Sequence, residues 1–263
     1  MARIAIFDSG VGGLSIYTEI KQQLPDSQYI FVSDNEAFPY GTKDENELKH
    51  RVLEVVERIN HQFAPDLLVI ACNTASTVVL PLLRDKFSFP IVGVVPAIKP
   101  AAQLTKSNII GLLATPATIN RQYTDQLIDD FATDCDVIKV GSSRLVQIAE
   151  DKLHGRNIDQ QQIKTEIQPL LESENIDIIV LACTHFPLLN KEIKEIVNVK
   201  HDVCLLDSGE GIANRVVHLL AETQTKENKS EPSVAVFTEL TSLSPMFKAQ
   251  LVGFSFANTI LLN

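Results

Sequence analysis

Short runs of aliphatic and β-branched residues alternate with amphipathic segments along almost the whole chain. Several runs are apolar nearly without a break, as in strands that are covered on both faces. The amphipathic stretches 44–62 and 159–173 predict helices. The predicted strands are RIAIFD (3–8), YIFVSD (29–34), DLLVIAC (66–72), PIVGVVP (90–96), NIIGLLAT (108–115), DVIKV (136–140), DIIVLAC (177–183), DVCLLD (202–207) and SVAVFTEL (233–240). This alternation predicts an α/β fold with mostly parallel sheet and helices on both sides.

Nine strands are many for one open sheet, so we expect two α/β domains. Two short motifs occur in both parts of the chain. DSG stands at 8–10 and 207–209, and the apolar runs ending in Ala-Cys continue as ACNT (71–74) and ACTH (182–185). The order of the motifs is reversed in the second part, which suggests two related units that face one another. With crossovers near 94–101 and 207, the domains would be 1–96 plus 208–263, and 97–207.

Composition excludes several classes of protein. The net charge is −10 and no Lys/Arg run exceeds two residues, which argues against a nucleic-acid partner. No apolar stretch approaches the roughly 20 residues that span a bilayer. The four cysteines form no C-x-x-C pair, so we expect neither a disulfide scaffold nor a metal site, and reduced thiols fit a cytoplasmic protein. The N-terminus resembles a first strand rather than a signal peptide, and 224–233 predicts a polar surface loop.

Polar motifs fall where predicted strands pass into helices, which is where ligands bind in open α/β sheets. The glycines of DSGVGG (8–13) permit close approach of the backbone to an anion, although they also suit a tight turn. AFPYGTKD (37–44) could clamp a substrate through Tyr40 and Gly41 or could be a connector. Thr115 and Thr118 are candidates for binding, with N-capping as the simpler alternative.

The strand-to-helix junctions at Cys72 and Cys183 are the most informative about the chemistry. A helix N-terminus favours a thiolate by at most ~2 kcal/mol, or about 1.5 pKa units, and desolvation opposes it. A neighbouring proton acceptor must therefore assist each thiol. His185 lies two residues after Cys183, and Asp8 would lie near Cys72 if the first and third strands are neighbours. Cys135 and Cys204 lack such polar neighbours and are interpreted as structural.

Two matching thiols favour one chemistry over others. Inverting a carbon centre by proton exchange needs a base on one face and an acid on the other, and the reverse reaction exchanges their roles. A nucleophilic thiol enzyme needs a single Cys with a His base. A redox pair is normally close in sequence. The duplicated junction therefore favours two-base proton exchange.

The motifs together resemble the cofactor-independent glutamate racemases of bacterial cell-wall synthesis. The resemblance covers essentially the whole chain through IFDSGVGGLS (6–15), FPYG (38–41), ACNTAS (71–76), IVGVVPAIKPA (91–101), LACTHFPLL (181–189) and LLDSG (205–209). It implies two pseudo-symmetric α/β domains with the active site between them. It also implies interconversion of L- and D-glutamate without a cofactor or metal, supplying D-glutamate for peptidoglycan.

The resemblance also implies roles for individual residues. Cys72 would be the base toward D-glutamate, assisted by Asp8, and Cys183 the base toward L-glutamate, assisted by His185. Glu150 would support that histidine. The implied substrate-binding residues are Ser9, Tyr40, Gly41, Asn73, Thr74, Thr115, Thr118 and Thr184.

Further expectations concern partners and alternatives. GSSRLVQIAEDKLHG (141–155) resembles the subgroup that responds to a cell-wall precursor activator, while a monomer and a homodimer both stay open. An aspartate or hydantoin racemase of the same superfamily would share both cysteines. A non-catalytic protein that binds small anions could use the Gly- and Thr-rich junctions, but it would have no need of paired thiols.

Overall fold

The computed structural model describes residues 1–198, 202–222 and 231–263, and its strands form two sheets. Every strand pair in these described ranges is parallel. No helix in them is long and apolar enough to cross a membrane. Residues 224–230 of the predicted surface loop lie outside the described residues.

The first sheet has six strands in the order β10-β9-β2-β1-β3-β4. They are β1 (Arg3–Asp8), β2 (Gln28–Ser33), β3 (Leu67–Ile70), β4 (Ile91–Gly93), β9 (Val234–Phe237) and β10 (Asn258–Leu261). The central strands are buried almost throughout, which explains their unbroken apolar sequences. Because β1 pairs with both β2 and β3, the segments that follow these strands meet at one edge of the sheet.

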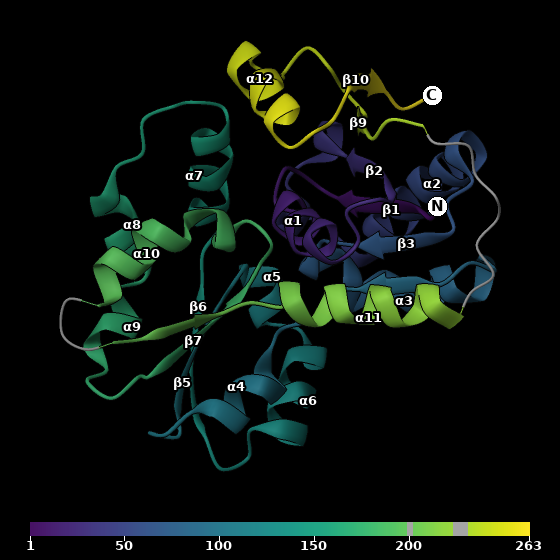
Figure 1. Cartoon of the computed structure of the whole chain (residues 1–263). Coiled ribbons are helices and arrows are strands. Elements are labelled where there is room, and N and C mark those ends of the chain that lie inside the picture. Colours follow the sequence, from purple (N-terminus) through teal and green to yellow (C-terminus); the bar gives the residue numbers. More distant parts are fainter. Residues whose placement is uncertain (199–201, 223–230) are drawn as a thin grey trace.

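Helices cover both faces of this sheet, as Figure 1 shows. Two apolar clusters, one on each face, hold them there. One face carries α1 (Leu14–Gln23), α11 (Gly209–Glu222) and α12 (Pro245–Gly253), and the other carries α2 (Glu45–Phe63) and α3 (Asn73–Lys86). Two short 3₁₀ helices, η1 (Asn35–Ala37) and η2 (Tyr40–Thr42), lie between β2 and α2. The side chain of Asp44 caps α2 by accepting from the backbone N–H of Asn46 and Glu47.

The second sheet has four strands in the order β6-β5-β7-β8. They are β5 (Ile109–Ala114), β6 (Asp136–Gly141), β7 (Ile178–Ala182) and β8 (Cys204–Leu206). Its helical elements are α4 (Ile98–Leu104), α5 (Pro116–Ile119), α6 (Gln122–Phe131), α7 (Arg144–Leu153), α8 (Gln160–Glu166), α9 (Gln168–Glu172), η3 (Phe186–Leu189) and α10 (Asn190–Val197). One apolar cluster packs α7 to α10 on one face, and another packs α4 and α6 on the opposite face.

The chain passes between the two sheets twice, after β4 and after β8. The hydroxyl of Ser208 donates to the carbonyl oxygen of Val95 at 2.5 Å and so ties the two crossings together. Strands of 3–93 and 234–261 build the first sheet, and strands of 109–206 build the second. The α/β class with parallel sheets is confirmed, and the division at 96/97 and 207/208 stays our interpretation.

Three predictions about the elements need correction. A tenth strand, β10, was missed because its sequence NTIL lies in a short C-terminal segment without a distinctive pattern. The helix predicted over 159–173 is broken into α8 and α9, and Pro169 lies in the first turn of the second piece. Cys204 is exposed rather than part of the core, since it opens β8 at the edge of its sheet, and Cys135 is half-buried.

Candidate active site

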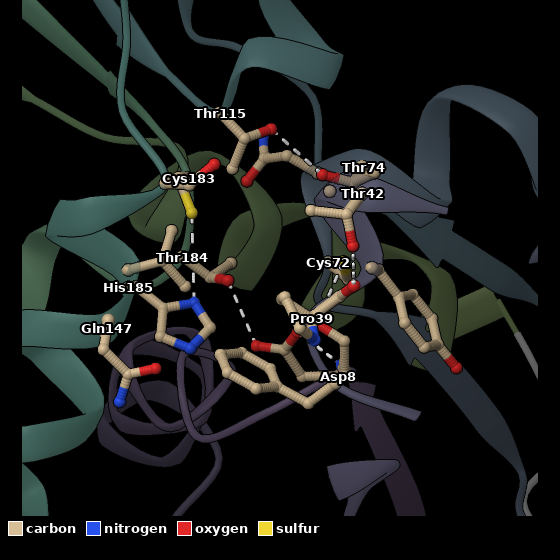
Figure 2. Close-up of a pocket in the computed structure, with 17 residues that line it drawn as sticks. Asp8, Pro39, Thr42, Cys72, Thr74, Thr115, Gln147, Cys183, Thr184 and His185 are labelled. Carbon is tan, nitrogen blue, oxygen red and sulfur yellow. Dashed lines mark hydrogen bonds between the residues drawn. The ribbon is translucent and has the colours of Figure 1, made fainter. Parts of the chain in front are cut away.

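A cavity lies between the carboxyl ends of the two sheets, and most of the predicted site residues line it. The centre of a water molecule can occupy about 60 Å³ of this cavity. That is space for a few water molecules and suits a small ligand. Its lining residues are Asp8, Ser9, Phe38, Pro39, Tyr40, Gly41, Thr42, Cys72, Asn73, Thr74, Thr115, Ser143, Val146, Gln147, Cys183, Thr184 and His185. Figure 2 shows Cys72 and Cys183 on opposite sides of this space.

The first sheet supplies Cys72 and its neighbours. Because β1 and β3 are paired, the segments after them place Ser9 beside Cys72, with Oγ and Sγ 3.6 Å apart. Asp8 is fully buried and accepts from the backbone N–H of Ser9 at 2.6 Å. Its second oxygen accepts from the hydroxyl of Thr184, which belongs to the other sheet's half, at 3.1 Å. Asp8 therefore joins the two halves of the site.

Burial sets the protonation of this half. It raises the pKa of the Cys72 thiol, and the negative charge of Asp8 raises it further. Burial also raises the pKa of the Asp8 carboxyl, against the lowering effect of His185. Cys72 occupies the N-cap position of α3, but the effect of desolvation on its pKa outweighs the lowering effect of the Ala75 backbone N–H there. In this structure Cys72 is a thiol, and Asp8 is a stronger proton acceptor than an exposed carboxylate.

The second sheet supplies Cys183 with a different partner. The Cys183 sulfur lies 3.9 Å from Nδ1 of His185, whose other nitrogen, Nε2, lies 2.7 Å from Oε1 of Glu150. The same carboxylate oxygen accepts from the backbone N–H of Val11 at 2.9 Å. Glu150 lies on α7, behind the histidine as seen from the cavity, and is not among the lining residues.

This arrangement favours the cationic form of His185. Burial by itself would lower the pKa of His185, but hydrogen bonds to Cys183 and Glu150 and the charge of Glu150 raise it well above its usual value. A cationic imidazole 3.9 Å from the sulfur stabilises negative charge on Cys183. The two thiols are therefore assisted unequally, one by a carboxylate and the other by a His–Glu pair.

The expectation that a helix N-terminus would favour the thiolate at both cysteines is wrong for Cys183. A turn and the four-residue η3 follow it, and α10 begins only at Asn190. Pro187 in the first turn of η3 has no N–H, so no long row of backbone donors faces the sulfur. At Cys183, His185 rather than a helix N-terminus stabilises negative charge on the sulfur.

The glycines of the first loop are required by the site. A Cβ on Gly10 would lie 2.3 Å from Oε1 of Glu150, and a Cβ on Gly12 would lie 2.5 Å from Nδ1 of His185. Both distances are far below van der Waals contact. The loop therefore lets the His185–Glu150 pair pack directly on the backbone, which is more than a tight turn needs.

Polar groups without charge line the part of the cavity near α3 and α5. The Thr74 and Thr115 hydroxyls lie 3.2 Å apart across the two halves. Thr115 also caps α5, as the simpler alternative proposed, while Thr118 is fully buried behind it and does not line the cavity. The amide Nδ2 of Asn73 is buried and has no hydrogen-bond partner among the residues that the structure describes. An unpaired buried donor at the cavity wall suits a carboxylate ligand.

The segment 38–42 covers the cavity from the side of the first sheet. Phe38 packs against His185, with ring centroids 5.9 Å apart, and the Phe38–Pro39 peptide is cis. The 3₁₀ helix η2 in this segment lies against α5, so the segment also adjoins the second half. Tyr40 lines the cavity, yet its hydroxyl donates to Asp34, which does not. The expected contact of that hydroxyl with a substrate would require this bond to break.

Six lining residues were not among the predicted site residues: Phe38, Pro39, Thr42, Ser143, Val146 and Gln147. The last three follow β6 and begin α7, so the rule that ligands bind at strand ends would have included them. Figure 2 shows Gln147 next to His185 and Thr42 on the side of Cys72. In the part of the chain that the structure describes, no group of three or more His, Cys, Asp or Glu side chains could hold a metal ion.

Comparison with known proteins places this geometry in a family. Residues 5–216 match the model of the family described as Asp/Glu/Hydantoin racemase. A glutamate racemase of Photorhabdus laumondii is 49% identical over 257 residues, covering 96% of this chain and 88% of that protein. A glutamate racemase of Vibrio vulnificus is 50% identical over 227 residues, covering 86% of this chain and 84% of that protein.

Solved structures agree with these relatives. Escherichia coli glutamate racemase, crystallised with L-glutamate and the activator UDP-MurNAc-ala, has a TM-score of 0.94 at 43% identity and covers 99% of this chain and 98% of its own. A glutamate racemase from Bacillus anthracis has a TM-score of 0.80 at 30% identity, with coverages of 98% and 96%. With its fold, its paired-thiol cavity and these relatives, the chain belongs to the Asp/Glu/Hydantoin racemase family, in its glutamate racemase branch, and is an isomerase.

Proposed function

We propose that the chain interconverts L- and D-glutamate by proton exchange between Cys72 and Cys183, without a cofactor. The observation that carries this proposal is the pair of thiols that face one cavity from two sheets, each with its own proton partner. A nucleophilic thiol enzyme would need only one of them. A carbon held between the two sulfurs can lose a proton to one and gain a proton from the other, which inverts it.

The groups beside the two thiols suit a reaction that starts from L-glutamate. In this scheme the cationic form of His185 stabilises negative charge on the Cys183 sulfur, which removes the α-proton, and the electron pair stays on the α-carbon. Cys72, held as a thiol by burial, gives its proton to the opposite face. Cys183 ends as the thiol and Cys72 as the thiolate. Asp8 and Ser9 lie beside the Cys72 sulfur. The reverse reaction starts from that state, so the two cysteines exchange their roles.

Neutral donors would hold the two carboxylates of the substrate. None of the lining residues is Lys or Arg, so the donors available are hydroxyls, backbone N–H groups and amides such as that of Asn73. We assign Ser9, Tyr40, Gly41, Asn73, Thr74, Thr115 and Thr184 to substrate binding, with Tyr40 acting through its backbone. Thr118 supports Thr115, since their hydroxyls lie 3.0 Å apart.

The proposal is tested by circular dichroism of L-glutamate with the purified protein and no added cofactor. Aspartate and hydantoins, as alternative substrates, test the specificity. In deuterated water, Cys72→Ser and Cys183→Ser should each lose racemisation. Undiminished turnover in either variant contradicts the two-base assignment. Binding of glutamate without any turnover, retained in both variants, would favour the non-catalytic anion-binding alternative.

We further propose that the D-glutamate serves peptidoglycan synthesis and that a cell-wall precursor activates the enzyme. The support is the E. coli relative, whose structure contains UDP-MurNAc-ala as an activator. Adding this compound to the racemisation assay should raise kcat/KM for L-glutamate. An unchanged rate would remove the support for activation while leaving the catalytic proposal intact.

A further inference from the structure

The segment 38–42 is anchored by charged groups that do not line the cavity. The Tyr40 hydroxyl donates to Oδ2 of Asp34 at 2.5 Å, and Tyr40 is only 1% exposed. Arg51, on α2, donates to both oxygens of Asp34, from Nε at 2.8 Å and from Nη2 at 2.6 Å. A forked Arg–carboxylate pair of this kind fixes orientation as well as distance.

The anchor is itself tied to the catalytic strand. Asp34 is fully buried, and its backbone N–H donates to the carbonyl oxygen of Asp8 at 2.9 Å. Arg51 also donates to Glu36 at 2.7 Å, within η1. Burial and the charge of Asp34 raise the pKa of Tyr40, so its phenol stays a neutral donor across the physiological pH range. The chain of contacts runs from Arg51 to Asp34 and from there to Tyr40.

Movement at the anchor would reach both halves of the site. The segment packs on the catalytic histidine through Phe38, and its 3₁₀ helix η2 lies against α5 of the second half. Tyr40 lies between these two contacts, and its hydroxyl is the group that Asp34 holds.

We propose that Arg51 and Asp34 are positioning residues that hold the segment 38–42 on the substrate through the Tyr40 hydroxyl. This inference rests on the proposed glutamate racemisation. Neither Arg51 nor Asp34 is among the cavity-lining residues, so both act through Tyr40. The anchor therefore sets the affinity for glutamate, while the thiols set the chemistry.

Arg51→Lys keeps the charge but removes the fork, and Tyr40→Phe removes only the hydroxyl. Each variant should raise KM for both enantiomers about tenfold, the range expected for one hydrogen bond to a charged group, while kcat falls by less than about threefold. Because both changes interrupt one chain of contacts, the double variant should be no worse than the more severe single variant. Equilibrium binding of D-glutamate by calorimetry should weaken by the same factor.

Arg58→Lys is the matched control. It makes the same change on the same helix, but Arg58 bonds to the carbonyl oxygen of Leu262 and pairs with Glu54, far from the segment. It should leave KM unchanged, and thermal unfolding shows whether each variant is folded. A folded Arg51→Lys variant with KM and D-glutamate affinity within twofold of wild type overturns the inference. A merely structural role would lower the melting temperature and the active fraction without moving KM.

The two proposals fail differently. If the wild type neither racemises nor binds glutamate, the proposed function falls and the positioning role falls with it. If the wild type racemises glutamate but the Arg51 and Tyr40 variants keep its KM, or if their effects simply add, only the positioning role falls.

Discussion

Gly12→Ala tests how closely the catalytic histidine depends on the glycine loop. The new Cβ would lie 2.5 Å from Nδ1 of His185, 2.6 Å from Oγ1 of Thr184 and 2.8 Å from Cε1 of His185. Non-bonded contacts settle at about 3.5 Å, so the ring or the loop must move by about 1 Å. The ring is held at both ends, by Glu150 at 2.7 Å and near Cys183 at 3.9 Å, and it cannot move without lengthening one of these contacts.

This displacement gives an expected magnitude. A misplacement of about 1 Å at a catalytic group costs about 100-fold in rate, so kcat should fall by that order. Overpacking of a full core should also cost about 1–3 kcal/mol of folding free energy. The rate is measured by circular dichroism in both directions, together with deuterium entry at the α-carbon.

Gly211→Ala provides the matched control. Gly211 lies within α11, and apart from its own helix turn no heavy atom of the described residues lies within 4 Å of the place its Cβ would take. The same substitution there should leave kcat unchanged and stabilise the helix by up to about 1 kcal/mol. A Gly12→Ala variant with kcat within twofold of wild type and an unaltered melting temperature would refute the argument that the loop supports His185.

Three further predictions concern the charges and donors of the site. Glu150→Gln removes a carboxylate that raises the pKa of His185, so that burial then favours the neutral ring. The alkaline limb of the kcat/KM profile should therefore move to lower pH. An unmoved limb would contradict the pairing of His185 with Glu150. The folded state raises the pKa of His185, so protonated His185 adds to the free energy of unfolding. This contribution should be complete below about pH 6.5, the usual pKa of histidine, and should be lost as the pH rises through the raised folded-state pKa. Urea unfolding between pH 6 and pH 9 checks this, and a His185→Asn variant should lack that part of the slope. Asn73→Ala removes a buried donor that has no partner within the described part of the chain, so KM should rise about 10- to 100-fold while the free energy of unfolding hardly changes. A large loss of stability with unchanged KM would mean that the amide serves the fold instead.

Local sequence patterns were sufficient for the elements that are regular over a few residues. All nine predicted strands are present, because unbroken apolar runs are what a sheet covered on both faces requires. The helix predicted over 44–62 is α2, whose cap at Asp44 is a local signal. The strand NTIL near the C-terminus was missed because its neighbours in the sheet, rather than its own pattern, make it a strand.

The catalytic residues were also accessible from the sequence, for a topological reason. Ligand sites in parallel sheets gather at strand ends, so Asp8, Cys72 and Cys183 could be identified as strand-end residues before any contact was known. His185 followed from its closeness to Cys183 in sequence. The family resemblance supplied the substrate and the remaining candidates.

What only the tertiary structure decided is which of these strand ends meet and how each thiol is assisted. Glu150 reaches His185 from a different helix, and Arg51 reaches Tyr40 through Asp34 from another. Such contacts depend on strand order and on helix packing, which set positions that local periodicity does not encode. The pKa of Cys72 likewise depends on burial by both halves of the molecule, and the local helix-end pattern alone would have suggested the opposite direction.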